Sequence, residues 1–313
     1  GVQVVKVVRV KGWILTACVG AGAFVLAALA REATARDPTG AVDEICTLRN
    51  RGGDESLALY VSDAPSGNAK VVMGSFLVRR GKRHFLVDAG LGANIVHDFK
   101  QMGLGQRLLF AKPPERTLAQ ALQARGVAAS AIDFVFLTHA HWDHASGLSD
   151  LPGVPVRVSA IEWQWARAIT EPFGFGIVPS QLEVPKQFDP FQFDGPPAYG
   201  FAGSHDLFGD GSAIAVPLPG HTPGSSGLML RLKSGHRAFL LGDAAWLLEN
   251  VGGEGAGPRN HSRLGARLVG WNRTETMTTL EQLHRFTKAN PEVLLVPAHD
   301  GRVTDRWAEG CIR

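Results

Sequence analysis

The sequence predicts a mixed α/β protein built from two β-sheets with helices on their outer faces. From Ser56 onward, short β-rich runs alternate with helical stretches, and strands followed by a helix occur twice in succession. The 37 glycines and 18 prolines indicate many loops between short elements. With 45% hydrophobic and 19% charged residues among 313, the chain can bury a sizeable core, which excludes global disorder.

The expected elements follow one another in two halves. In the first half, β-rich runs bounded by turn residues predict strands at 56–62, 71–78, 84–90, 133–138 and 154–160. Helical patterns occupy 94–103, 117–126 and 160–170. In the second half, strands are expected at 212–220, 226–232, 236–244 and 292–298, with a helix at 276–290.

Residues 171–203 interrupt this alternation with six prolines and seven aromatic residues. A long loop inside a domain is usually functional, as a lid or as a pocket wall. The alternative is that the rings simply pack the loop onto the core. Under the first interpretation, Phe173 and Phe175 contact the substrate.

The positive charge of the chain is concentrated at its start. Residues 1–36 carry five bases and one acid, whereas the remainder holds 27 bases and 28 acids. The net charge of +3 therefore reflects the N-terminus and does not predict a basic face for nucleic acid.

Residues 13–30 form an uncharged, mostly apolar stretch preceded by Lys6, Arg9 and Lys11. This pattern is typical of a signal peptide or of a single membrane anchor, and both alternatives stay open for residues 1–30. A buried core helix is disfavoured by the flanking bases. We expect 31–55 to be a linker or lead-in and 56–313 to be the folded domain, exported to the periplasm or exterior or anchored in the inner membrane facing that side.

Two of the three cysteines lie near the ends of the predicted domain. Cys46 and Cys311 can pair in an oxidising compartment, and two free thiols are an equal alternative. Cys18 lies in the apolar segment. The sequence has no Cys-x-x-Cys, which excludes a structural zinc knuckle and a dithiol redox site.

The sequence Thr-His-Ala-His-Trp-Asp-His at 138–144 follows a strand-like run. Residues two apart on an extended chain face the same way, so His139 and His141 can bind one ion together. If the chain then turns, Asp143 and His144 face a second ion. Imidazole and carboxylate groups suit zinc, and one carboxylate can bridge two cations.

Three further segments have the composition of completing ligands. His221 lies in Pro-Gly-His-Thr-Pro-Gly, Asp243 ends Leu-Leu-Gly-Asp, and His299 follows Val-Pro-Ala. Alone, each is more often a hydrogen-bonded core or cap residue. With the first cluster they total seven ligands, enough for two ions that each keep a position for water.

These motifs, in this order and separation, resemble those of the metallo-β-lactamase-fold hydrolases over about residues 56–300. The resemblance implies an αβ/βα sandwich of two mixed β-sheets flanked by helices, with the metal site at one edge. It implies that one zinc takes His139, His141 and His221 and the other takes Asp143, His144 and His299, with Asp243 bridging the two. It also implies that Asp88 orients the ligands, and we place Thr138 and Thr222 beside them. The alternative for Asp88 is a turn cap.

Within that family the sequence is most similar to the N-acyl-homoserine lactonase branch. True β-lactamases of this fold lack the bridging carboxylate that Asp243 supplies. Two positions depart from the lactonases: Trp246 stands where they usually carry a tyrosine that helps hold the lactone, and Ser225 replaces a frequent histidine. We expect Trp246 to contact the substrate through its indole N–H.

The resemblance therefore implies a binuclear zinc hydrolase acting on a small ester or lactone through a metal-bridging hydroxide. Asp143 is the expected proton acceptor and donor, and residues 108–110 are expected to help line an apolar pocket. Manganese, cobalt or iron can use the same ligands. A phosphotriesterase or phosphodiesterase, a mononuclear iron sulfur dioxygenase and a non-catalytic binding module are alternatives. We expect a small-molecule substrate and no nucleic-acid partner. Residues 13–30 tether the chain to a membrane only if they are retained. The oligomeric state is open.

Overall fold

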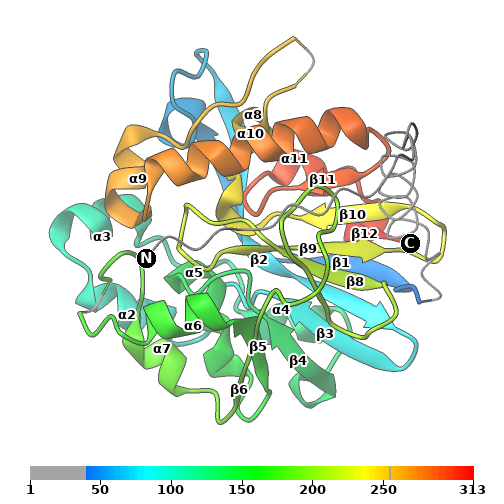
Figure 1. Cartoon of the computed structure of the whole chain (residues 1–313). Coiled ribbons are helices and arrows are strands. Elements are labelled where there is room, and N and C mark those ends of the chain that lie inside the picture. Colours follow the sequence, from blue (N-terminus) through cyan, green and yellow to red (C-terminus); the bar gives the residue numbers. More distant parts are fainter. Residues whose placement is uncertain (1–39, 172, 254) are drawn as a thin grey trace, which may run out of the picture. The chain divides into compact units, whose positions relative to one another are not determined.

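Two β-sheets pack face to face and bury a shared hydrophobic core between them (Figure 1). The computed structural model describes residues 40–171, 173–253 and 255–313. The predicted signal peptide or anchor lies outside this part. Among the residues described, no helix combines the length and apolar character needed to cross a bilayer.

The larger sheet has seven strands in the order β12-β1-β2-β3-β4-β5-β6, and the smaller has five in the order β11-β10-β9-β8-β7. The strands are β1 (Glu44–Ser56), β2 (Asn68–Arg80), β3 (Arg83–Val87), β4 (Ile132–Phe136), β5 (Val156–Ser159), β6 (Phe188–Phe191), β7 (His205–Asp206), β8 (Ala213–Pro217), β9 (Ser226–Arg231), β10 (Arg237–Leu240), β11 (Leu294–Val296) and β12 (Cys311–Ile312). Both sheets mix parallel and antiparallel pairs.

Helices flank the two sheets. The α-helices are α2 (Ile95–Asp98), α3 (Leu104–Phe110), α4 (Leu118–Ala124), α5 (Trp142–Ala145), α6 (Ala160–Ala166), α7 (Pro179–Glu183), α8 (Leu248–Val251), α9 (Arg263–Val269), α10 (Arg273–Ala289) and α11 (Gly301–Thr304). Short 3₁₀ turns are η1 (Leu57–Leu59), η2 (Phe99–Gln101), η3 (Ala129–Ala131), η4 (Ser146–Asp150), η5 (Gly242–Ala244) and η6 (Ala308–Gly310). The predicted fold class, two mixed sheets flanked by helices, is confirmed.

Alternating side chains build the layers of the sandwich. Phe85 and Val87 of β3 point into the core between the sheets, whereas Leu86 packs with α4 on the outer side. In the smaller sheet, Leu228 and Leu230 of β9 join the central core, while Met229 packs against α10. This two-residue period is the geometry of an extended chain buried on both faces.

The prediction that residues 31–55 form a linker or lead-in is wrong for the second half of this range. From Glu44 the chain forms β1, which pairs with β2 along its whole length. Buried Ile45 and Leu48 anchor this strand, but its polar partners and a Gly-Gly pair concealed the alternation. The strand predicted at 56–62 is instead the turn η1, at the end of the β1 strand.

Cys46 and Cys311 form a disulfide between β1 and β12. The two residues are opposite each other in the sheet register, with Cα atoms 4.1 Å apart. Of the two alternatives that the sequence left open, a disulfide or two free thiols, the structure contains the disulfide. It joins residues separated by 265 positions in the chain.

The interruption at 171–203 contains regular elements. Proline begins α7, where its missing N–H leaves no hydrogen bond unmade. Pro190 lies in β6, an edge strand of the larger sheet, where a ladder donor is dispensable. The segment was expected to be a loop because of its prolines. Pro179 and Pro190, however, occupy positions in α7 and β6 that tolerate proline.

Candidate metal centre

The predicted ligands converge at one edge of the sandwich. Asp88 follows β3, residues 138–144 follow β4, His221 follows β8, Asp243 follows β10, and His299 follows β11. Within each sheet these strands run in the same direction, so their carboxyl ends lie together. All seven predicted ligands are buried.

His139, His141 and His221 form the first group. Nδ1 of His141 lies 2.9 Å from Nε2 of His221, and one nitrogen from each ring falls within 4.8 Å of the others. The backbone at His141 is extended, as the His-x-His spacing predicts.

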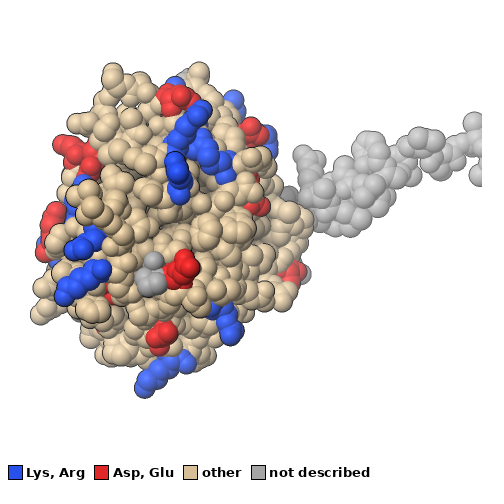
Figure 2. Space-filling view, turned by 90° about the vertical axis from the view of Figure 1, so that its left-hand side faces the viewer, with Lys and Arg blue, Asp and Glu red and all other residues tan. Residues whose placement is uncertain are grey.

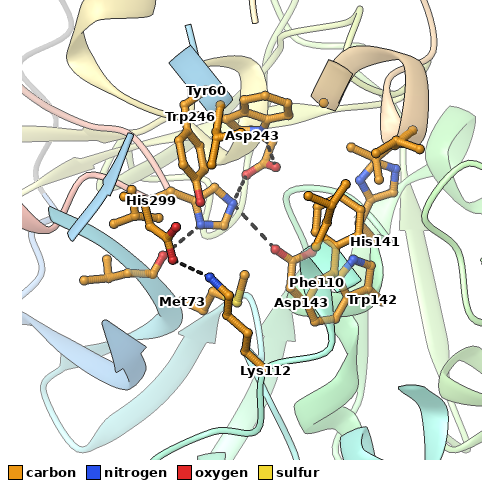
Figure 3. A pocket seen from close by; sticks show the side chains of 18 of the residues that line it. Tyr60, Met73, Phe110, Lys112, His141, Trp142, Asp143, Asp243, Trp246 and His299 are labelled. Atoms are coloured by element: carbon orange, nitrogen blue, oxygen red, sulfur yellow. Dashed lines mark hydrogen bonds and ion pairs between the residues drawn. The ribbon is translucent and has the colours of Figure 1, made fainter. Parts of the chain in front are cut away.

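Asp143, His144 and His299 form the second group. The chain turns into α5 at Trp142, so Asp143 and His144 lie on one short helical turn. Oδ2 of Asp143 is 3.6 Å from Nε2 of His299 and 3.8 Å from Nε2 of His144. Figure 3 shows the Asp143 and His299 side chains pointing toward each other across the pocket floor.

Asp243 lies between the two groups and turns one oxygen to each. Its Oδ2 is 3.2 Å from Nε2 of His221 and 3.9 Å from Nε2 of His139. Its Oδ1 is 3.1 Å from Nε2 of His144 and 3.2 Å from Nε2 of His299. One carboxylate thus connects all four of these imidazoles.

The chemistry of these donors fits divalent cations. Zinc bonds of about 2.0–2.1 Å in a tetrahedral arrangement put neighbouring ligand atoms about 3.3 Å apart. The separations across both groups, 2.9 Å to 3.9 Å, bracket that value. Nε2 of His139, Nε2 of His144 and Oδ1 of Asp243 are buried without a hydrogen-bond partner in the described chain. Cations bound at the two groups would together satisfy all three.

Asp88 contacts the second group, and its orienting role stays a prediction. Its Oδ2 lies 2.8 Å from Nδ1 of His144, and its Oδ1 accepts hydrogen bonds from the backbone N–H and hydroxyl of Thr138 at 2.8 and 3.1 Å. Asp88 adopts a φ of 60°, a strained conformation for a residue with a side chain. The contacts of the buried carboxylate hold it there, so Asp88 does more than cap a turn.

The outward nitrogens of three imidazoles are occupied, which leaves Nε2 free to ligate. Nδ1 of His139 lies 3.1 Å from the Thr138 hydroxyl, and Nδ1 of His299 lies 2.8 Å from the Val72 carbonyl. With Asp88 on His144, these partners favour the tautomer that carries its proton on Nδ1.

Glu162 of α6 is a site residue that the sequence prediction missed. It is fully buried, and its carboxylate accepts hydrogen bonds from the Ala140 N–H at 2.9 Å, the Thr222 hydroxyl at 2.7 Å and the Gly224 N–H at 3.1 Å. Burial raises the pKa of Glu162 to about 7. Thr222, which was predicted to lie beside the ligands, therefore binds Glu162. The Glu162 carboxylate in turn links the His-x-His loop to the His221 loop.

The Asp243 carboxylate and the buried imidazoles of His144 and His299 shift each other's pKa values in favour of the charged forms. Burial lowers the pKa of His299, but the carboxylates of Asp243 and Asp143 raise it to about 9. The pKa of His144 is also raised, by Asp88, Asp243 and Asp143 against burial. Burial would raise the pKa of Asp243, but the surrounding imidazoles hold it well below its ordinary value.

Trp246 occupies a different role from the one predicted. Its indole N–H donates to Oδ2 of Asp243 at 2.8 Å, so it is not free for a substrate. Its ring stacks on His261 with centroids 4.0 Å apart and still lines the pocket. The short spacing of three residues after Asp243, on a turn, brings the indole back onto its own carboxylate.

A pocket that is partly open to solvent leads to the second group. Its walls include η1 with Tyr60, the β2 residues 71–73, the end of α3 at 108–110, and α9. The expected contribution of 108–110 is therefore present. Phe173 and Phe175 do not line this pocket: Phe173 is buried beside Trp142, and Phe175 packs edge-on against Trp165 and Trp271.

Tyr60 is a second residue that the sequence prediction missed. Its side chain points into the pocket in the direction of His299 and the carboxylates (Figure 3). Burial and the negative charges of Glu55, Asp143 and Asp243 raise its pKa, while Arg51 lowers it. No motif marks Tyr60, because only the tertiary fold brings the end of η1 to the site.

The surface on one side of the molecule carries charges of both signs. In Figure 2, Lys and Arg side chains are scattered among Asp and Glu side chains and separated by wide uncharged areas. On this face no single sign of charge covers a continuous region.

Comparisons with known proteins agree with this geometry. The model of the metallo-β-lactamase superfamily matches residues 75–286. A probable metallo-hydrolase of Mycobacterium tuberculosis is 29% identical over 224 residues, which cover 69% of this chain and 70% of that protein. The N-acyl homoserine lactonase AttM of Azorhizobium caulinodans is 25% identical over 178 residues, covering 56% and 65% of the two chains.

Among solved structures, an N-acyl homoserine lactone hydrolase with N-hexanoyl-L-homoserine at its catalytic metal centre superposes with a TM-score of 0.63. The superposition covers 86% of this chain and 97% of that one at 16% sequence identity. At that identity the likeness establishes the shared fold.

Proposed function

The chain belongs to the metallo-β-lactamase superfamily, and from that premise we propose that it hydrolyses a small ester or lactone with two zinc ions. Hydrolases of this fold bind a divalent metal, and the relatives support a metal-dependent hydrolase. The observation that carries the proposal is Asp243, whose two oxygens face two separate groups of ligands.

His139, His141 and His221 would hold one cation, and Asp143, His144 and His299 the other, with Asp243 shared. Bound there, zinc lowers the pKa of a water toward about 7 and polarises a carbonyl group. The complete second group argues against a mononuclear iron oxygenase, because a single ion would not need it. Manganese, cobalt and iron share these ligand preferences.

Asp143 is the residue of the site best placed to move a proton. It lies at the pocket floor and is 8% exposed, so its carboxylate meets both the ligand cluster and an incoming substrate. A carboxylate there can accept a proton from the attacking water and deliver it to the leaving alkoxide. Its Oδ2 lies 3.6 Å from Nε2 of His299, a second candidate ligand.

The pocket supports a substrate with an apolar chain. Leu108, Leu109 and Phe110 of α3 line it together with Leu264 and Leu268 of α9. Such walls bury hydrocarbon, while the polar floor receives the reacting carbonyl. Lactonases among the relatives act on N-acyl homoserine lactones by name, so an acyl lactone is the first substrate to test.

Replacement of Asp143 tests the proposal. We expect Asp143→Asn to lower kcat by at least about 100-fold, because the amide neither accepts the proton nor completes the second ligand group. Zinc content is measured alongside turnover of N-hexanoyl-homoserine lactone. The matched control is Asp189→Asn, whose carboxylate is largely exposed on β6. Normal turnover by Asp143→Ala or Asp143→Asn would contradict the assigned role.

We also propose that the chain is exported. The disulfide between Cys46 and Cys311 supports this, because disulfides persist mainly in oxidising compartments. Residues 1–39, which hold the predicted leader or anchor, lie outside the part that the structure describes.

A further inference from the structure

The donors around the pocket floor are not equally available to a substrate. The Trp246 indole N–H is already bound to Asp243. The Lys112 ammonium group is paired with Glu55. The Tyr60 hydroxyl lines the same pocket and has no hydrogen-bond partner among the described residues.

The backbone and ring of Tyr60 are held in place from several sides. Its N–H donates to the Leu57 carbonyl at 3.0 Å, and its carbonyl accepts from the Ser262 N–H at 3.0 Å. Its ring packs edge-on against Trp246, with centroids 6.0 Å apart and planes at 83°. A phenol fixed in this way loses little entropy when its hydroxyl binds a ligand.

The hydroxyl points from the pocket wall toward the reacting end of the site (Figure 3). Asp143, Asp243 and His299 of the ligand cluster line the same pocket as Tyr60. A phenol is protonated at neutral pH, and burial raises the pKa of Tyr60 further, so its hydroxyl can donate. A neutral donor in a buried site stabilises negative charge that develops on an oxygen.

We propose that the Tyr60 hydroxyl donates a hydrogen bond to the carbonyl oxygen of the bound ester or lactone. The bond strengthens as that oxygen becomes negative during attack on the carbonyl carbon, so it favours the transition state over the bound substrate. No proton is transferred. The role rests on the proposed function, and it makes Tyr60 a substrate-contacting residue supplied by the segment after β1.

The chain offers a matched pair of variants, because Tyr60 and Tyr199 are its two tyrosines. Tyr199 packs edge-on against Phe286 and does not line the pocket. With the zinc-loaded full chain and N-hexanoyl-homoserine lactone or 4-nitrophenyl hexanoate, we expect Tyr60→Phe to lower kcat about 10- to 100-fold. This is less than for a sole oxyanion donor, because the cations share the task.

The same kinetics distinguish this role from simple packing. We expect KM and zinc content to stay close to those of the unsubstituted chain in Tyr60→Phe, because phenylalanine keeps the ring against Trp246. Tyr199→Phe should retain the full kcat. An unchanged kcat in Tyr60→Phe, or equal losses in both variants, would overturn the proposal.

A binding readout separates this proposal from the proposed function. In protein labelled with ¹³C at tyrosine Cζ, the two variants assign the two resonances. Adding N-hexanoyl-homoserine, the hydrolysed product, should shift the Tyr60 resonance and leave that of Tyr199 in place. A Tyr60 resonance that does not move overturns its role. A shift without hydrolysis of any ester or lactone supports Tyr60 as a ligand contact and overturns the proposed function instead.

Discussion

The Asp243 carboxylate shows how single residues shape the candidate metal centre. A buried carboxylate is costly unless it is paired, and four imidazoles and one indole N–H surround this one. The imidazoles hold its pKa low, so it stays ionised and able to bind cations on both sides. Sequence spacing identified this residue and the six other candidate ligands, because each follows an apolar strand and their motifs are short and local.

The pKa of His299 predicts how zinc affinity depends on pH. In the metal-free chain, Asp243 and Asp143 raise this pKa from 6.5 to about 9, so the imidazole is protonated at neutral pH. The protonated ring stabilises the metal-free fold below pH 6.5, and this contribution is lost as the pH rises through about 9. Zinc must displace that proton, so its affinity should rise over the same interval.

Competition with a chelating dye at several pH values measures this dependence. Substitution of an exposed histidine, as in His97→Asn on α2, should leave the slope unchanged. An affinity that is constant or falls between pH 6.5 and about 9 would contradict the electrostatic description of the second group.

At the level of elements, α6 links two ligand loops through one side chain. Ser159 caps this helix, with its hydroxyl accepting from the N–H of Glu162. A serine followed three residues later by a glutamate is the sequence pattern of a capping box. Here the Glu162 carboxylate instead turns inward to Ala140, Thr222 and Gly224. The local pattern therefore predicts a helix start and conceals the contact with the site.

We expect Glu162→Gln to weaken zinc binding about 10-fold or more, as is typical when a group that orients metal ligands is lost. The amide nitrogen would face donors that now meet a carboxylate oxygen, and the free energy of unfolding should fall by about 1–3 kcal/mol. Chelator competition and denaturant unfolding measure the two effects. Glu281→Gln, on the exposed side of α10, is the matched control. Wild-type zinc affinity in Glu162→Gln would show that the two loops hold their places without this carboxylate.

The strands with two buried faces were predictable because their apolar runs are nearly continuous, as in β4 and β9. The first strand was missed because one of its faces is polar and it contains two glycines. The pocket wall was also assigned wrongly in part. Phe173 and Phe175 lie in an aromatic-rich segment, but their rings fill the core or contact Trp165 and Trp271.

On the scale of the whole molecule, the site depends on two sheets meeting along one edge. The larger sheet supplies Asp88 and the 138–144 loop, and the smaller supplies His221, Asp243 and His299. The disulfide joins β12, the C-terminal edge strand of the larger sheet, to its neighbour β1. Tyr60 and Glu162 gain their roles only through this assembly, which is why no local pattern identified them.

The most direct test of the account measures metal content and hydrolysis together on the purified chain. The panel holds N-hexanoyl-homoserine lactone, 4-nitrophenyl hexanoate, an aryl phosphotriester and a β-lactam. We predict about two zinc ions per chain, turnover of the lactone or the ester, and loss of turnover on metal removal with recovery on adding zinc. One iron per chain with no hydrolysis, or turnover that survives metal removal, would contradict the proposed binuclear hydrolase.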